Sequence, residues 1–407
     1  MTERQISTPK LSALPFERVP EGIERRFDAC GLPETPGDPY EELLARFEDQ
    51  YVPFSGFWEL THKCNLDCVM CYNVPTSQSE LSTDEGLGVL EQLAAAGTLS
   101  LTLTGGEILT RRDFFVLAQR ARELGFALDL KTNGTLITPE VADRLAALNP
   151  VRVDISLLGA TDATFDRVAR SKDSLRRVLR GINLLRERHV RVHLNTLLMD
   201  LNVAERQQMA ELAAELGAFY QQTFKISTAD DGQDKSGQHQ LSTQAMADLL
   251  QADNTPFLPP LRSPGSRTCS VGLSSFVISP YGDIFPCIEL RMPAGNLRQQ
   301  RFAEIWANGP IFQDLRTKHV YKNLPECRVC PINSYCEGRC AGLAWKEHGD
   351  LYGGHSLACQ QAQARYEHQH PGQAAPQTPL QAKLATRGNG AIKASNGRTQ
   401  PIPLLGL

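Results

Sequence analysis

The sequence lacks any apolar run long enough to cross a membrane as a helix, and its N-terminal segment has no hydrophobic signal core. It also lacks a strong bias toward either charge, since 42 basic and 46 acidic side chains leave a formal net charge of -4. A chain without a basic excess has no general attraction to nucleic acid or to anionic membranes. These absences predict a cytoplasmic protein with no nucleic-acid and no membrane partner.

Cysteine, by contrast, is abundant. The chain has 11 cysteines in 407 residues, and all but one fall within residues 64–71 and 269–359. In a long chain without an export signal, clustered cysteines indicate metal ligands rather than disulfides. The remaining residue, Cys30, is predicted to be an ordinary thiol.

Six candidate strands alternate with amphipathic segments along the first half of the chain. These strands are expected at 57–61, 99–104, 127–131, 151–156, 190–196 and 223–227. Strand–helix alternation favours a parallel sheet or barrel, and six units are two fewer than a complete barrel has. The predicted fold is therefore α/β, with a partial (β/α)6 barrel.

Helix-start and helix-stop signals support the alternation. Ser82 is a plausible N-cap, with Glu85 at the third helical position and Gly97 just past the end. Comparable signals are Thr138 followed by Pro139, and Asn202 with Glu205 and Gly217.

Composition suggests five segments. Residues 1–50 form an N-terminal extension with one helix near Tyr40–Glu48, and residues 51–228 form the barrel core. Residues 229–267 are polar and proline-rich, and are predicted to be a linker with a helix at Thr243–Gln251. Residues 268–365 are loop-rich and cysteine-dense, which is typical of a small domain held by metal. Residues 366–407 are predicted to be a disordered tail.

The first cysteine group has the spacing C-x3-C-x2-C, formed by Cys64, Cys68 and Cys71 after the first predicted strand. Three thiolates can hold three irons of a 4Fe–4S cluster and leave the fourth iron open for chemistry. The alternatives are a zinc loop or unrelated thiols. The motif resembles that of the radical SAM superfamily, whose open iron binds the amino and carboxylate groups of S-adenosylmethionine (SAM).

Further turns match the same family. Gly105, Gly106 and Glu107 resemble its GGEP motif, which holds the methionine amino group, although Ile108 replaces the proline. By this resemblance, the glycines would let the backbone approach SAM and the glutamate would accept from its ammonium. The other SAM-binding candidates are Tyr72, Thr132 and Asn133 of a TNG turn, Ser156, Arg170 and Asn195.

The resemblance also implies a reaction. One electron from the reduced cluster would cleave SAM to methionine and a 5′-deoxyadenosyl radical, which removes hydrogen from an unactivated carbon. The very low potential required implies a flavodoxin or ferredoxin as electron donor.

The second cysteine group resembles the SPASM domain of peptide and protein maturases. Its pattern is Cys269-x12-Gly282-x4-Cys287 and Cys327-x2-Cys330-x5-Cys336-x3-Cys340, followed by Cys359. The resemblance implies two auxiliary 4Fe–4S clusters, making three in all. One would be bound by Cys327, Cys330, Cys336 and Cys359, and the other by Cys269, Cys287 and Cys340. The zinc ribbon is the alternative.

Two positions bear on the second of these sites. Ser275 stands where some relatives have a further cysteine, so that the cluster nearer the active site has either an open iron or a non-cysteine ligand. Glu289 is expected to be a surface charge, with a ligand or a base as alternatives.

The favoured function is oxidative maturation of a ribosomally made peptide. The alternatives are a tetrapyrrole enzyme of the haem pathway, a sulfatase-maturating enzyme, and a non-catalytic iron–sulfur electron carrier. Ile288 follows Cys287, at the position where sulfatase-maturating enzymes have an aspartate. This difference argues against a sulfatase-maturating enzyme. The N-terminal extension is too short for the usual peptide-recognition domain, so a separate recognition protein is a candidate partner.

Overall fold

The computed structural model describes residues 39–386, apart from residues 75, 228, 230–236, 254–264, 268 and 337, together with two short strands. Residues 1–46 and 47–407 form two compact units. In the first unit, β1 (Arg26–Phe27) pairs antiparallel with β2 (Pro33–Glu34), and α1 (Pro39–Asp49) begins. The helix predicted near Tyr40–Glu48 is confirmed, whereas Cys30 lies outside the described residues.

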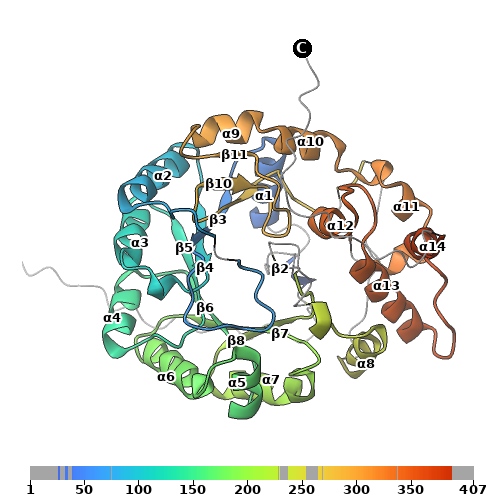
Figure 1. The fold of residues 1–407 in the computed structure, drawn as a ribbon, viewed down its shortest axis with the longest axis horizontal. Helices are drawn as coiled ribbons and strands as arrows, with labels where there is room; N and C mark the ends of the chain where they lie inside the picture. Colours follow the sequence, from blue (N-terminus) through green and yellow to red (C-terminus); the bar gives the residue numbers. More distant parts are fainter. Residues whose placement is uncertain are drawn as a thin grey trace, which may run out of the picture. The chain divides into compact units, whose positions relative to one another are not determined.

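Six parallel strands form the centre of the second unit, inside an arc of helices (Figure 1). They are β3 (Ser55–Thr61), β4 (Ser100–Gly105), β5 (Ala127–Thr132), β6 (Arg152–Ser156), β7 (Val192–Leu197) and β8 (Phe219–Thr223), paired in that order. The sixth strand was predicted at 223–227, and this prediction was wrong, because β8 lies at Phe219–Thr223. Side chains of β8 alternate between exposed and half-buried, so the strand has no apolar signal in the sequence.

Helices follow most of these strands. They are α2 (Thr83–Ala95), α3 (Phe114–Glu123), α4 (Pro139–Ala147), α5 (Asp162–Ala169), α6 (Ser174–Glu187) and α7 (Arg206–Glu215), with single turns η1 (Ile108–Thr110) and η2 (Val203–Glu205). The predicted capping box of Ser82 and Glu85 is present at α2, and Thr138 caps α4. Asn202, which precedes η2, makes no side-chain hydrogen bond that caps the helix. The carboxylate of Glu205 instead accepts hydrogen bonds at the start of α5, from Ala160 and Thr161 among others.

The strands alternate between apolar and polar side chains. Leu101, Leu103, Leu128 and Leu130 are fully buried in the core between sheet and helices. The residues between them are polar, and Asp129 bonds across the strands, since its Oδ2 lies 3.3 Å from Arg152 Nη2. This alternation follows from the two-residue period of a strand and supports the barrel expectation.

The cysteine-rich half adds three strands to the same sheet. β9 (Ser275–Ile278) pairs in parallel with β3, β10 (Asp283–Phe285) pairs antiparallel with β9, and β11 (Gly295–Asn296) forms the edge. The sequence predicted a separate loop-rich domain. The nine-stranded sheet instead runs β11-β10-β9-β3-β4-β5-β6-β7-β8 through both halves.

Short helices complete the second half. They are η3 (Gly237–His239), α8 (Thr243–Asp253), α9 (Phe302–Asn308), α10 (Pro310–Lys318), η4 (Tyr321–Asn323), α11 (Pro325–Arg328), η5 (Asn333–Tyr335), α12 (Ala341–His348), α13 (Ser356–Gln369) and α14 (Pro379–Thr386). The helix expected at Thr243–Gln251 is confirmed as α8, which packs against α13. No helix in the described residues combines the length and apolarity needed to cross a membrane.

The predicted disordered tail needs correction over residues 366–386. This stretch forms the end of α13 and the whole of α14, where Leu380 is buried against the cysteine-rich half. Tertiary contacts, among them the burial of Leu380 and the Lys383–Glu326 ion pair, hold a segment whose composition alone looks unstructured. Residues 387–407 lie outside the described residues.

Candidate functional site

Cys64, Cys68 and Cys71 lie together in the loop after β3. Cys64 and Cys71 are exposed and Cys68 is half-buried. Burial, followed by the neighbouring thiols of Cys71 and Cys64, raises the pKa of Cys68 to about 12. The loop is held by backbone hydrogen bonds, including Val69 N–H to Val168 O at 3.0 Å. Cys64 and Cys71 therefore lie close enough to act on the Cys68 thiol, on a loop that solvent can reach.

Gly105 and Gly106 bring the end of β4 against the start of this loop. Gly106 N–H donates to Thr61 O at 2.7 Å. A Cβ on Gly105 would lie 2.2 Å from Thr61 O, and one on Gly106 would lie 2.4 Å from Lys63 O. The close approach that these glycines allow is therefore between two backbone segments, and their predicted contact with SAM stays a prediction.

Glu107 joins two of the predicted turns from inside the protein. Its carboxylate is fully buried and accepts hydrogen bonds from Thr132 Oγ1 and Asn133 N, each at 2.7 Å, and from Leu109 N at 3.0 Å. Burial raises the pKa of Glu107, against the effect of these hydrogen bonds. These contacts hold the carboxylate at the junction of the two turns, and its acceptance of a hydrogen bond from the ammonium group of SAM stays a prediction.

Asn133 connects the TNG turn with the cysteine loop. Its amide nitrogen donates to Asn65 Oδ1 at 2.9 Å and approaches Cys64 Sγ at 3.8 Å. Asn65 in turn donates to Thr135 Oγ1 at 2.9 Å. The end of β5 thus supports the first cysteine of the motif.

The remaining candidates lie at the same ends of the strands. Ser156 ends β6 directly opposite Asn195 of β7. Arg170 ends α5 in a left-handed conformation, with φ of 50°, and pairs at 3.2 Å with Asp67 of the cysteine loop, where both side chains are exposed. Because parallel strands share one carboxyl end, the predicted SAM-binding residues gather around the three cysteines.

Tyr72 leads to a cluster that sequence reasoning missed. Its hydroxyl donates to Glu59 Oε1 at 3.3 Å, and Glu59 is fully buried on β3. Arg291, from the cysteine-rich half, donates to both carboxylate oxygens, one at 3.0 Å, and His62 lies 3.3 Å away. Although burial favours the neutral acid, hydrogen bonds and charges from His62 and Arg291 lower the pKa of Glu59 to about 2. The sequence signal for this cluster was one charged residue, Glu59, within the predicted strand at 57–61.

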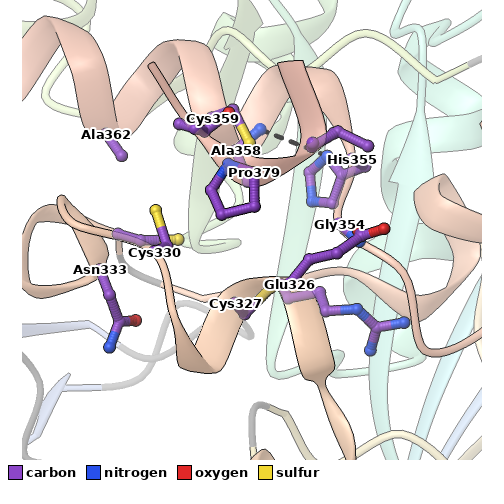
Figure 2. A pocket seen from close by; sticks show the side chains of 14 residues that line it. Glu326, Cys327, Cys330, Asn333, Gly354, His355, Ala358, Cys359, Ala362 and Pro379 are labelled. Atoms are coloured by element: carbon purple, nitrogen blue, oxygen red, sulfur yellow. Dashed lines mark hydrogen bonds between the residues drawn. The ribbon is translucent and has the colours of Figure 1, made fainter. Parts of the chain in front are cut away.

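Four second-half cysteines line one cavity. Figure 2 shows Cys327 and Cys330 on one side and Cys359, from α13, on the other. Cys336 completes the set. Burial raises the pKa of Cys359 to about 12, assisted by the thiols of Cys336, Cys330 and Cys327. The structure brings together the four residues that the resemblance assigns to one cluster.

Residues beyond the expected domain end close this cavity. Thr378, Pro379 and Leu380 form part of its lining, and the Thr378 side chain hydrogen-bonds Cys359. Lys383 of α14 pairs with Glu326, beside Cys327. The segment predicted as a tail therefore belongs to the thiol site.

Cys269, Cys287 and Cys340 form the second set. Burial raises the pKa of Cys269 to about 12, and the thiols of Cys287 and Cys340 add to the effect. Ser275, the position of the additional cysteine in some relatives, begins β9.

Glu289 lies beside this set and is only 5% exposed, so its expected place on the surface was wrong. Its carboxylate lies 3.2 Å from Lys225 Nζ and 3.6 Å from Lys346 Nζ, and accepts from the Ser227 hydroxyl. These cations lower the pKa of Glu289 despite its burial. Burial of a carboxylate is tolerable here because two lysines neutralise it.

The donor chemistry fits iron–sulfur clusters. No disulfide joins the ten described cysteines, and they form sets of three, three and four. A thiol must lose its proton to bind iron, and iron ions supply positive charge that stabilises several thiolates held close together. Within the described ranges, no three His, Cys, Asp or Glu side chains converge on a point for a single metal ion.

Comparison with known proteins identifies the two halves. Residues 58–213 match the radical SAM superfamily, and residues 269–331 match an iron–sulfur cluster-binding domain, SPASM. An AdoMet-dependent heme synthase of Methanosarcina barkeri is 31% identical over 325 residues, covering 72% of this chain and 92% of the relative. The mycofactocin maturase MftC of Mycobacterium tuberculosis is 30% identical over 325 residues, covering 74% and 82%.

Solved structures share the fold. Streptococcus suis SuiB bound to S-adenosylmethionine matches 81% of this chain and 82% of its own, with a TM-score of 0.58 and 17% identity. The enzyme anSMEcpe with bound AdoMet gives a TM-score of 0.58 over 82% of this chain and 100% of its own, at 16% identity. Together with the cysteine sets and the strand-end turns, these matches show that the chain is an enzyme of the radical SAM superfamily with a C-terminal SPASM domain.

Proposed function

We propose that this enzyme carries out a net two-electron oxidation of a ribosomally made peptide, installing a crosslink or another oxidised bond. The observation that carries the proposal is the pair of half-buried thiol sets in the second half, which would provide sites for an electron acceptor in addition to the SAM-dependent centre. A peptide substrate is supported by the relatedness to a mycofactocin maturase.

Three 4Fe–4S clusters fit the thiol sets: one at Cys64, Cys68 and Cys71, and two in the SPASM domain. When bound, the first cluster and SAM supply a 5′-deoxyadenosyl radical that removes hydrogen from the substrate. The chain's own residues position the parts. Glu107 fixes the GGE and TNG turns, while Ser156 and Asn195 offer a hydroxyl and an amide for the ribose or carboxylate of SAM.

The open cysteine loop suits SAM exchange, and the buried sets suit electron transfer. A substrate that has lost one hydrogen atom must lose a further electron and a proton to complete the oxidation. The auxiliary sites lie in the half of the chain that shares its sheet with the barrel, and a cluster there would accept this electron. A flavodoxin or ferredoxin would supply the first electron, and a separate protein would present the peptide.

A haem-pathway tetrapyrrole is the second candidate substrate. It is favoured by the 31% identity to the AdoMet-dependent heme synthase, a relative that this chain covers almost completely. Both candidate reactions would use the same SAM-dependent centre, and they differ in the substrate that would bind in the barrel.

One experiment separates them. The full chain is reconstituted anaerobically with iron and sulfide, its iron is counted, and dithionite and SAM are added together with one of two substrates. The first is a short peptide encoded beside the gene, and the second is an iron porphyrin with propionate side chains. We expect 5′-deoxyadenosine by chromatography and a peptide lighter by two hydrogen atoms by mass spectrometry.

The other outcomes are equally informative. Loss of propionate carboxyl groups from the porphyrin, with the peptide unchanged, would replace the first proposal by the second. Zinc instead of iron and no 5′-deoxyadenosine would contradict both.

A further inference from the structure

Arg339 lies between the two cysteine sets of the SPASM domain, in the three-residue spacing that separates Cys336 from Cys340. It is only 4% exposed, and it contributes to the lining of the cavity formed by the four cysteines. A buried arginine remains charged and needs partners for all of its N–H groups.

Two of its three nitrogens are held by the protein. Nε donates to the Gly353 carbonyl, and Nη1 lies 3.0 Å from His319 Nε2. Because a guanidinium can only donate, His319 accepts at Nε2 and carries its proton at Nδ1. Burial and the charges of Arg339 and Arg267 lower the pKa of His319 to about 4, which keeps the imidazole neutral. These contacts fix the orientation of the guanidinium.

The third nitrogen is different. Nη2 is inaccessible to solvent and has no hydrogen-bond partner among the described residues. An unsatisfied N–H of a charged group is costly in a protein interior, so its presence beside a thiol-lined cavity points to an acceptor that the bound cluster brings. Thiolate and sulfide sulfurs of an iron–sulfur cluster are such acceptors.

The charge of Arg339 also reaches both cysteine sets. Arg339 directly precedes Cys340 in the sequence and lines the same cavity as Cys327, and the thiols of Cys327, Cys269 and Cys340 lie within electrostatic reach of its guanidinium. Cys327 belongs to the four-cysteine set, whereas Cys269 and Cys340 belong to the three-cysteine set. One fixed positive charge therefore acts on both auxiliary sites.

We propose that Arg339 is a positioning residue that donates an Nη2–H hydrogen bond to a sulfur of the four-cysteine cluster, and that its charge raises the reduction potentials of both auxiliary clusters. Positive charge and hydrogen bonds to sulfur stabilise the reduced state of a cluster. A higher potential makes the auxiliary clusters better acceptors for the substrate's electron. The proposal rests on the cluster assignment given under Proposed function.

The test is a redox titration of the anaerobically reconstituted full chain, followed by electron paramagnetic resonance. We expect Arg339→Gln to lower the equilibrium constant for reduction of an auxiliary cluster at least tenfold, or about 59 mV for a one-electron couple. Arg339→Lys, which keeps the charge, should stay closer to the unaltered protein. The cluster at Cys64, Cys68 and Cys71, identified by its spectral response to SAM, should not shift.

Arg316→Gln is the matched control. Arg316 is a similarly buried arginine of the same half, 6% exposed, but the charges acting on it include no thiol. Its replacement should leave the auxiliary potentials unchanged. Full iron content with an unchanged potential in Arg339→Gln would overturn the inference, as would an equal shift in the Arg316→Gln control. Absence of iron from the unaltered protein would instead overturn the cluster assignment.

A measurement on the unaltered sequence covers the case in which the variants lose iron. The chain is produced with ¹⁵N in the guanidinium groups of arginine and reduced, and pulsed electron paramagnetic resonance is recorded on the auxiliary clusters. We expect a ¹⁵N coupling from a guanidinium in hydrogen-bond contact with a cluster sulfur. Its absence from a fully loaded protein would refute the hydrogen bond.

Discussion

The two cysteine regions of this enzyme are built in opposite ways. In the first, Cys64 and Cys71 are exposed on a loop held by hydrogen bonds from the ends of regular strands. In the second, the thiols are half-buried among short helices and turns, and the pKa of Cys269, for example, rises to about 12 through burial. The first site is thus an open loop that hydrogen bonds hold in place, whereas the second is a set of thiols partly enclosed by the packed helices of the cysteine-rich half.

This difference matches different tasks. A centre that exchanges SAM needs an open position and an entry route, and the barrel supplies a rigid frame around it. A centre that only passes electrons benefits from exclusion of water, which also sets its potential. The comparison predicts that damage to the first region stops all chemistry, and that damage to the second region separates SAM cleavage from product formation.

The largest effect is expected from Cys68→Ala. Removing one of three thiols should abolish 5′-deoxyadenosine formation and lower the iron content by about four per chain. Chromatography and an iron assay measure both. Cys30→Ala, which removes the one cysteine outside the three sets, is the control and should behave like the unaltered protein. Deoxyadenosine formation at the normal rate in Cys68→Ala would refute the first site.

Cys330→Ala tests the second cysteine region. The four-cysteine cluster should be lost, product formation should stop, and SAM cleavage should continue in part, because the strand-end frame is untouched. The measurement is the ratio of product to 5′-deoxyadenosine. If that ratio matched the unaltered protein, the auxiliary site would have no part in the mechanism.

The ion pair between Glu59 and Arg291 connects the two regions. Arg291→Met would leave a fully buried carboxylate without its cation, which costs about 3–5 kcal/mol of unfolding free energy. Urea unfolding under anaerobic conditions measures this loss, and Glu59→Gln in the same chain should recover much of it. The control is Arg298→Met, which breaks an exposed pair with Glu85 and should cost about 1 kcal/mol or less.

The same pair predicts a pH dependence. The pKa of Glu59 is lowered from 4.5 to about 2 in the folded chain, so ionised Glu59 stabilises the fold above about pH 4.5. This contribution should be lost as the pH falls toward 2. Glu59→Gln should flatten the acid limb of the stability curve between these values, and an unchanged limb would contradict the lowered pKa.

The smallest effect is expected from Glu107→Gln. An amide cannot accept hydrogen bonds through both of its terminal atoms, so either the Thr132 or the Asn133 contact is lost. We expect 5′-deoxyadenosine formation to fall about 10–100-fold at full iron content, as for other residues that orient metal ligands. Glu91→Gln, at an exposed pair on α2, should leave the rate unchanged. A loss of iron instead of rate would show that Glu107 supports folding of the loop.

Local signals in the sequence were sufficient for much of this structure. Apolar alternation located five of the six barrel strands, and the family resemblance carried by the cysteine pattern implied the four-cysteine set that the fold brings together. β8 was misplaced because an open-edge strand with polar side chains carries no such alternation.

Long-range contacts explain the remaining differences. Glu59 and Arg291 are 232 positions apart, and no local sequence pattern around either residue predicts their contact. Glu289 was expected at the surface because its lysine partners come from distant segments. The sequence predicted SAM contacts for Gly105, Gly106 and Glu107, but it gave no signal for the contacts between neighbouring turns that the same residues make in the structure.

The pairing of β9 with β3 makes the two halves a poor target for dissection. A chain truncated before residue 268 would leave the β3 side of the sheet without its neighbour, exposing unpaired N–H and C=O groups along Ser55–Trp58. Such a bare edge invites pairing with other chains, so an isolated barrel should aggregate rather than act as a minimal enzyme. Any fragment or chimera of this protein should therefore retain β9 together with the barrel.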